Sequence, residues 1–132
     1  MRIVIGQGSC GIAAGAEKVR KALMNTNITS DISITGCIGM CYLEPIVDIY
    51  DDNGGLTRLV KVSETDADAI ASYVNTGNKS FVEKLVVTPE DSEFLSKQTR
   101  IALRNCGVIN PENIDAYTDA DGYTALKRRS RK

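Results

Sequence analysis

Two glycine-rich turns that carry cysteine constrain this sequence more than any other feature. Residues 6–11 hold Cys10, and residues 36–41 hold Cys37 and Cys41. Each turn follows a short run of β-branched and other apolar residues, which predicts a strand. We expect the two turns to lie at the same end of a small sheet, so that the three cysteines converge there.

The first 78 residues predict the element order β-α-β-β-β-α. Asp51 to Gly55 is typical of a hairpin turn. Ser63 or Thr65 is a suitable cap for the last helix, and Gly77 lies beyond its end. This order favours an α/β fold of the thioredoxin-like kind, a small mixed sheet with helices packed on it. The predicted strands are Arg2–Gly6, Asp31–Thr35, Ile46–Tyr50 and Leu56–Val62, and the predicted helices are Ala13–Asn25 and Ser63–Asn75.

Beyond residue 78 the pattern changes. Residues 79–132 are few for a core of their own, so we expect a domain of residues 1–78 followed by a helical extension that connects or docks. Phe94, Leu95 and Ile101 are candidates for a face toward a partner. The expected elements are an extended segment at 81–87, a helix from 88–91 to 105–107, and a helix from 110–112 that stops at 121–122.

Composition narrows the chemistry of the cysteines. The 132 residues contain four cysteines and no histidine. This excludes a Rieske-type cluster and a histidine-based catalytic triad, because both require histidine. No apolar run is long enough for a membrane span, and the N-terminus does not resemble a signal peptide. We therefore expect a cytoplasmic protein without membrane insertion, whose cysteines are thiols, metal ligands or redox groups rather than structural disulfides.

Basic residues gather at the C-terminus. Residues 127–132 carry five of the 16 basic residues, whereas the rest of the chain is acidic. Such a cluster can bind nucleic acid, but a frayed, solvated terminus is the simpler interpretation, because no second basic patch extends it. We expect no nucleic-acid partner.

The first glycine turn also matches a dinucleotide-binding fingerprint. Gly6, Gly8 and Gly11 have its spacing, and Asp31 lies about 20 residues further on, where that motif has its ribose-binding acid. However, the chain is short for a doubly wound sheet, and a hairpin follows in place of repeated βαβ units. We therefore interpret the glycines as residues that let the backbone fold closely around Cys10.

The cysteine spacing indicates an iron–sulfur site more strongly than a zinc site or a dithiol active site. Cluster ligation needs thiolates that converge from loops, with free N–H groups that can point at sulfur. Ile38, Met40 and Leu43 are apolar residues that could shield such a site. Zinc sites prefer C-x2-C and often histidine, and dithiol enzymes usually have C-x-x-C. Buried structural thiols remain a further alternative.

Three stretches carry a family resemblance: residues 5–16 (IGQGSCGIAAGA), residues 35–47 (TGCIGMCYLEPIV), and residues 98–117 (QTRIALRNCGVINPENIDAY) with 122–126. The first two resemble the thioredoxin-like [2Fe-2S] ferredoxin domain of complex I-type NADH dehydrogenases and of NAD-linked, electron-bifurcating hydrogenases. The third resembles the segment that leads into the FMN- and NADH-binding core of their flavoprotein subunits.

The resemblance implies a [2Fe-2S] cluster with Cys10, Cys37 and Cys41 as ligands. The family has four cysteines, spaced C-x4-C and C-x3-C, and Cys37 and Cys41 match the second pair. In the first pair only Cys10 is present, because Ile5 or Gly15 stands where its companion belongs.

The fourth ligand therefore stays open. Ser9, Glu44, Cys106 and solvent are candidates, although Cys106 is better explained as a buried thiol at a helix end. A labile cluster, or one that has been lost, is the other possibility.

The resemblance implies an electron-transfer module within an NADH-linked oxidoreductase or hydrogenase complex. Its partners would be flavoprotein and other iron–sulfur subunits, which residues 90–126 would contact. The family's FMN- and NADH-binding loops would lie beyond residue 126, so we expect no catalysis by this chain alone. The alternative function is a cluster-free assembly or interaction module with the same fold.

Overall fold

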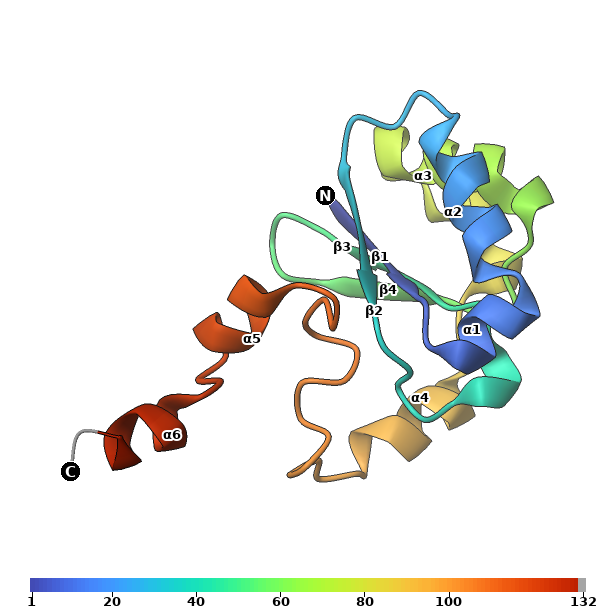
Figure 1. Ribbon diagram of the computed structural model, residues 1–132. Coiled ribbons are helices and arrows are strands. Elements are labelled where there is room, and N and C mark those ends of the chain that lie inside the picture. Colours follow the sequence, from blue (N-terminus) through green and yellow to red (C-terminus); the bar gives the residue numbers. More distant parts are fainter. Residues whose placement is uncertain (131–132) are drawn as a thin grey trace.

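A four-stranded mixed sheet organises the protein (Figure 1). The structure is a computed structural model, and it describes residues 1–130. The strands lie in the order β2-β1-β3-β4, with β1 parallel to β2 and antiparallel to β3, and with β3 antiparallel to β4. The strand bounds are β1 Arg2–Gly6, β2 Asp31–Thr35, β3 Val47–Tyr50 and β4 Leu56–Leu59.

The predicted fold class and element order are confirmed, with two strands shorter than expected, since β3 begins at Val47 rather than at Ile46. β1 and β2 have the predicted bounds, but β4 ends at Leu59 rather than at Val62. The chain turns away there because Lys61 adopts a left-handed backbone conformation, with φ of 51°. The Lys61 and Val62 N–H groups then donate to the carbonyl groups of Leu43 and Pro45 instead of continuing the ladder.

The first part of the chain contains three α-helices. Between β1 and β2 lie α1 (Ser9–Ala14) and α2 (Ala16–Met24), and α3 (Ala67–Thr76) comes after β4. The prediction of one helix over 13–25 is wrong in its start and its continuity, because the helix begins at Ser9 and Gly15 interrupts it with φ of 105°. The predicted cap at Ser63 is confirmed as a capping box with Asp66 at the 3-10 turn η2 (Glu64–Asp66), which precedes α3.

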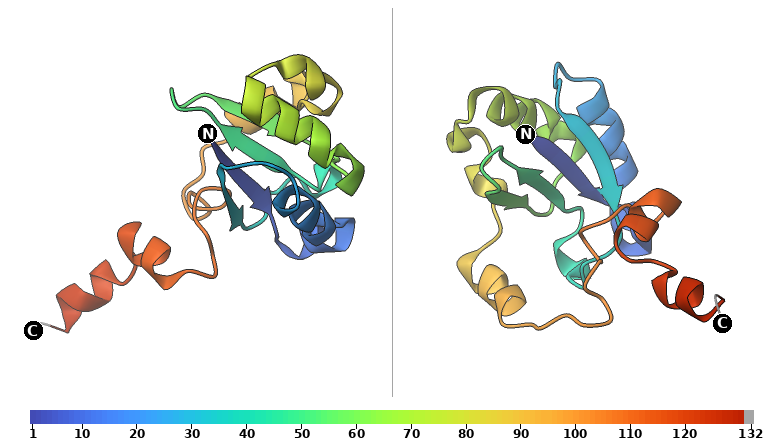
Figure 2. Two further views of the ribbon diagram at one scale, coloured as in Figure 1. Left: turned by 90° about the horizontal axis from the view of Figure 1, so that it is seen from above. Right: turned by 90° about the vertical axis from the view of Figure 1, so that its left-hand side faces the viewer.

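The apolar face of the sheet packs against α2 and α3. Alternate residues of a strand share one face, and those on this face are almost fully buried. Figures 1 and 2 show both helices on the same side of the sheet. The residues from the strands are Ile3, Ile5, Val47, Ile49 and Leu59, and those from the helices include Val19, Leu23, Ile70 and Tyr73.

The opposite face of the sheet carries buried polar groups. Asp48 and Arg58 are register partners on β3 and β4, and the Arg58 guanidinium donates to both carboxylate oxygens at 2.7 and 2.6 Å. Only 3% of Asp48 is exposed. Thr35 points to the same face and donates from its hydroxyl to the Ile109 carbonyl at 3.0 Å, so the C-terminal segment crosses this side.

Residues 79–87 form two 3-10 turns, η3 (Lys79–Phe81) and η4 (Glu83–Leu85), where an extended segment was predicted. The only strand-like contact is a single bridge between Leu59 and Val86. Val82, between the two turns, enters the main core and is 1% exposed.

The prediction of one helix over residues 88–107 is also wrong, because the observed helix is much shorter. The helix α4 spans Pro89–Ser96, begins at a Thr88 cap, and does not continue. Leu95 packs on a second apolar cluster, whereas Phe94 and Ile101 stay exposed, so no continuous apolar face supports a longer helix. The chain instead extends back across the sheet toward Ile109.

The last described residues form two short helices that lead away from the sheet (Figures 1 and 2). The helix α5 spans Ile114–Asp119, and Asn113, rather than the predicted 110–112 segment, caps it by accepting two N–H groups. The helix α6 spans Thr124–Arg129, where a frayed terminus was predicted. The remaining tail residues, 131–132, lie outside the described part of the chain. Among residues 1–130, no helix is both long and apolar enough to cross a bilayer.

Candidate metal centre

The three cysteines singled out by the sequence converge at one end of the sheet. Cys10 lies in the first turn of α1, Cys37 follows β2, and Cys41 begins the 3-10 turn η1 (Cys41–Leu43). Their Sγ atoms all lie within 4.8 Å of one another, and the Cys37 and Cys41 Sγ atoms are 3.5 Å apart. Cys10 and Cys37 are half-buried, and Cys41 is exposed.

Glycine makes this convergence sterically possible, as the sequence predicted. A Cβ atom at Gly8 would lie 2.9 Å from the Cβ of Cys37 and 3.0 Å from its backbone nitrogen. A Cβ atom at Gly11 would lie 2.4 Å from the Gly6 carbonyl oxygen. A side chain at either position would push the two cysteine turns apart or disrupt the start of α1.

The thiols of Cys10 and Cys37 do not ionise alike. Burial, and then the neighbouring thiols of Cys37 and Cys41, raise the pKa of Cys10 to about 12. Burial also acts against ionisation of Cys37, but the Gly39 N–H and the other two thiols outweigh it and lower the Cys37 pKa. The Gly39 nitrogen lies 3.3 Å from the Cys37 sulfur. The Cys37 thiol therefore ionises more readily than the Cys10 thiol, whose proton a bound metal would displace.

Glu44 lies beside the thiols as a buried acid. It is 7% exposed, its Oε1 lies 3.9 Å from the Cys10 Sγ, and its Oε2 accepts the Ile46 N–H at 2.8 Å. Burial raises the pKa of Glu44, and the Ile46 N–H partly offsets this. No ion pair to Glu44 is present within residues 1–130.

The other two candidate ligands are placed differently. Cys106 does not belong to the group of clustered ligand atoms. It precedes Gly107 in the segment that crosses the sheet, and no helix ends there, contrary to the prediction. Ser9 is exposed at the first position of α1.

An apolar cluster anchors the turn that carries Cys37 and Cys41. Ile38, Met40 and Leu43, which the sequence suggested as shielding residues, are all buried. They pack with Ile46, and Leu95 of α4 is half-buried against them. This second core is separate from the one beneath α2 and α3, and it fixes the turn from behind.

Sequence reasoning missed Arg100, which holds the C-terminal segment on the same turn. Its guanidinium donates to the carbonyl oxygens of Ile38 and Cys106. Gly107 fits against Ile38, because a Cβ atom there would lie 2.4 Å from the Ile38 Cγ2. No local sequence signal identifies this contact, because the two partners are 62 residues apart.

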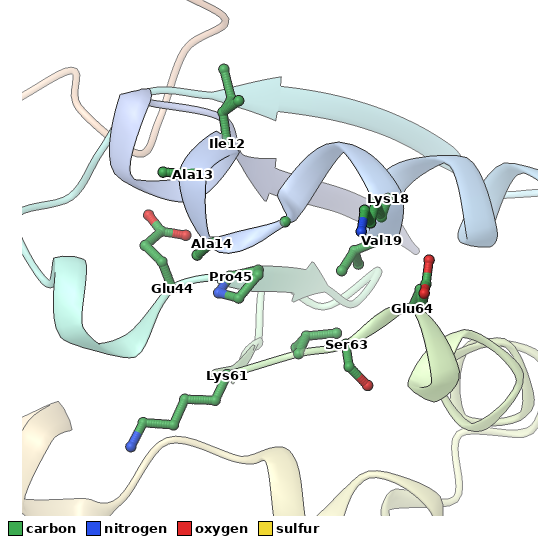
Figure 3. Close-up of a pocket in the computed structure, with 12 residues that line it drawn as sticks. Ile12, Ala13, Ala14, Lys18, Val19, Glu44, Pro45, Lys61, Ser63 and Glu64 are labelled. Carbon is green, nitrogen blue, oxygen red and sulfur yellow. The ribbon is translucent and has the colours of Figure 1, made fainter.

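A hollow of about 510 Å³ adjoins the thiols on the far side of Glu44. α1, the start of α2 and residues 61–64 line it, and no cysteine does. Figure 3 shows Glu44 pointing toward Ala13 and Ala14, whereas Lys61 points away from them. Glu44 lines the hollow and also accepts a hydrogen bond from the Cys10 thiol.

The structure does not support the dinucleotide-binding alternative. Asp31 begins β2 and pairs with Arg2, whereas the glycine turn begins at Gly6, the partner of Thr35. Four residues of extended strand, about 13 Å, therefore separate the acid from the turn along the strand. Asp31 lies at the wrong end of the sheet to assist a ligand at the glycines.

Comparison with known proteins identifies the architecture. No protein-family model matches the chain, and no curated protein matches it. Among solved structures, it is similar to the wild-type thioredoxin-like [2Fe-2S] ferredoxin from Aquifex aeolicus, with 23% identity and a TM-score of 0.56 over 66% of this chain and 95% of that chain. A cysteine-to-serine variant of that ferredoxin gives 24% identity and a TM-score of 0.54, over 66% of this chain and 97% of the other.

A further structure of a thioredoxin-like [2Fe-2S] ferredoxin from the same organism gives 22% identity and a TM-score of 0.53, over 66% of this chain and 89% of that one. At this level of identity, the likeness concerns the path of the backbone rather than the chemistry. Together with the observed sheet order, it establishes that this chain has a thioredoxin-like fold of the kind seen in ferredoxins.

Proposed function

We propose that this chain is an electron-transfer module that carries a [2Fe-2S] cluster on Cys10, Cys37 and Cys41. The observation that carries the proposal is the convergence of the three Sγ atoms within 4.8 Å. Thiolates are the ligands that hold such clusters, and the solved structures with this fold are named as [2Fe-2S] ferredoxins. The donor set of three soft sulfur atoms fits the group.

When bound, the cluster would accept and release one electron at a time. The chain's own groups would set how readily this happens. The Gly39 N–H points at the Cys37 sulfur, and hydrogen bonds to ligand sulfur stabilise the added negative charge. The buried Glu44 carboxylate opposes that charge. Cys41 is exposed, so electrons would enter or leave on its side.

The partners in this proposal are flavoprotein and other iron–sulfur subunits of an NADH-linked oxidoreductase or hydrogenase complex. Support comes from the resemblance of residues 98–117 to the flavoprotein segment, and from the apolar side chains that the C-terminal segment leaves exposed. Single exposed apolar residues are ordinary, but several on one segment favour a contact surface. The exposed residues are Ile101, Leu103, Val108, Ile114, Tyr117, Tyr123 and Leu126.

The decisive experiment is anaerobic purification, with iron, acid-labile sulfide and zinc counted per chain beside a visible spectrum. We expect two irons and two sulfides, and charge-transfer bands that dithionite bleaches. Cys37→Ser should lose most of the iron, whereas Cys106→Ser, a matched thiol outside the cluster, should keep it. A chain that binds zinc alone, or no metal after reconstitution, would contradict the proposal and favour the cluster-free interaction module.

A further inference from the structure

Buried carboxylates in proteins are normally paired with a cation or coordinate a metal. Glu44 is 7% exposed, and within residues 1–130 no lysine or arginine pairs with it. Its Oε2 accepts the Ile46 N–H, and its Oε1 accepts a long hydrogen bond from the Cys10 thiol at 3.9 Å. One carboxylate oxygen is therefore held in place while the other faces a candidate ligand.

All three sulfur atoms lie within 4.8 Å of one another, and two donor distances at the site are short. The Cys37 and Cys41 sulfur atoms are 3.5 Å apart, and the Glu44 Oε1 and the Cys10 sulfur are 3.9 Å apart. Two ligands of one tetrahedral metal, with bonds of about 2.3 Å, lie about 3.8 Å from each other. The Cys37–Cys41 spacing is close to that value. The Glu44 Oε1 would have to move about 0.3 Å closer to the Cys10 sulfur, because bonds from a metal to oxygen are shorter, about 2.1 Å.

The surrounding backbone is shaped around this carboxylate. A Cβ atom at Gly6 would lie 3.1 Å from both Glu44 oxygens, and one at Gly11 would lie 3.1 Å from Oε2. The two glycines next to the Cys10 turn therefore leave the carboxylate the room it occupies. Ser9 is exposed, and Cys106, like Glu44, is outside the group of three clustered thiols. Glu44 differs from both in having an oxygen 3.9 Å from the Cys10 sulfur.

From these observations, and resting on the proposed function, we infer that Glu44 is the fourth ligand of the cluster. The structure assigns Cys37 and Cys41 to one iron, and Cys10 and the Glu44 Oε1 to the other. A carboxylate carries the same negative charge as the thiolate that it replaces, so the cluster keeps four anionic ligands. The site is then complete without a fourth cysteine.

The test compares the reconstituted wild-type chain with Glu44→Gln and Glu44→Cys. The glutamine variant keeps the shape and the acceptor for Ile46 but removes the charge, so it should fold. We expect its resistance to iron removal by a chelator to fall by about tenfold or more, since even lesser changes around metal ligands cost that much. The cysteine variant should hold the cluster at least as tightly as the wild type.

Mössbauer spectra of the wild type, enriched in ⁵⁷Fe, give a second measurement that needs no variant. One iron with an oxygen ligand and one with sulfur ligands alone should give two distinct doublets of equal area. In Glu44→Cys these should converge, because both irons are then bound by sulfur only. Ser9→Ala and Cys106→Ser serve as controls and should leave both spectra and chelator resistance unchanged.

The outcomes separate this inference from the proposed function. A wild-type chain that holds two irons and two sulfides, and whose chelator resistance and spectra are unchanged in both Glu44 variants, overturns the Glu44 assignment and leaves the electron carrier standing. The same holds if Ser9→Ala or Cys106→Ser, rather than Glu44→Gln, loses the iron. A wild-type chain without cluster overturns both.

Discussion

The two faces of the sheet are stabilised by different means. On one face, Ile3, Ile49 and their neighbours pack against α2 and α3 as an apolar core. On the other, Asp48 and Arg58 form a partly buried ion pair, and Thr35 bonds to the C-terminal segment. Burial of apolar surface is favourable without a specific partner. Buried polar groups are tolerated only while each has its partner, so the second face depends on named contacts.

The largest effect should come from removing one member of the ion pair. Asp48→Ala leaves the Arg58 guanidinium half-buried without its carboxylate, and we expect the free energy of unfolding to fall by about 3–5 kcal/mol. Urea unfolding followed by circular dichroism measures the change. A loss below 1 kcal/mol would show that water already reaches this face and that the contrast between the faces is overstated.

Replacing both charges sharpens the same comparison. Asp48→Leu combined with Arg58→Met removes the pair without leaving an unpaired charge, and such replacements are often neutral or stabilising. We expect the double variant to recover most of the stability lost in Asp48→Ala. If it remains as unstable as the single variant, packing rather than charge pairing governs this face.

On the apolar face, Ile49→Ala should lower the free energy of unfolding by about 2–5 kcal/mol, because it leaves a cavity beneath α2 and α3. Neither substitution leaves a polar group unpaired. Ile49→Val removes only one methyl group, so it should lower the free energy of unfolding much less, by about 0.5–1.5 kcal/mol. The same urea titration distinguishes the two variants. Equal losses for valine and alanine would contradict a well-packed core at this position.

A smaller effect is expected where the C-terminal segment meets the polar face. Thr35→Val removes the hydroxyl that donates to Ile109, and we expect a loss of about 0.5–1.5 kcal/mol. Amide hydrogen exchange should rise mainly in residues 100–110, while the strands stay protected. A uniform rise across the sheet would mean that this contact supports the whole fold rather than one segment.

The smallest effect belongs to the exposed apolar residues of that segment. Ile101 is 78% exposed, so Ile101→Ser should change the free energy of unfolding by no more than about 0.5 kcal/mol. If the segment binds a partner subunit as proposed, the same variant should weaken that binding. A large loss of stability in the isolated chain would show that Ile101 packs within the molecule.

Much of the sheet could be predicted from local signals. β-branched alternation predicted β1 and β2 to the residue, and the Ser63 cap with Gly77 predicted the start and end of the α3 region. Local signals failed where distant contacts decided the conformation. Leu59 ends its strand because Lys61 and Val62 bond elsewhere, and the 97–113 segment stays irregular because it crosses the polar face.

At the candidate site, too, local sequence signals predicted some features and distant contacts decided the others. Spacing and glycine content sufficed to group Cys10, Cys37 and Cys41, because each turn follows a strand of one small sheet. The sequence left Ser9, Glu44, Cys106 and solvent open as the fourth ligand, with Cys106 better explained as a buried thiol, since spacing does not reveal burial. The tertiary structure separates them by one buried oxygen beside the Cys10 sulfur.

The sequence by itself determined the element order, the strands around the cysteine turns and the three converging thiols, because these follow from periodicity, turn chemistry and short-range sterics. The tertiary structure alone decided that the sheet has a polar face crossed by the C-terminal segment, that Arg100 holds the Cys37 turn, and that Glu44 is buried beside Cys10. These contacts join residues 34 to 74 positions apart, and no local pattern encodes which distant side chain will fill a given space.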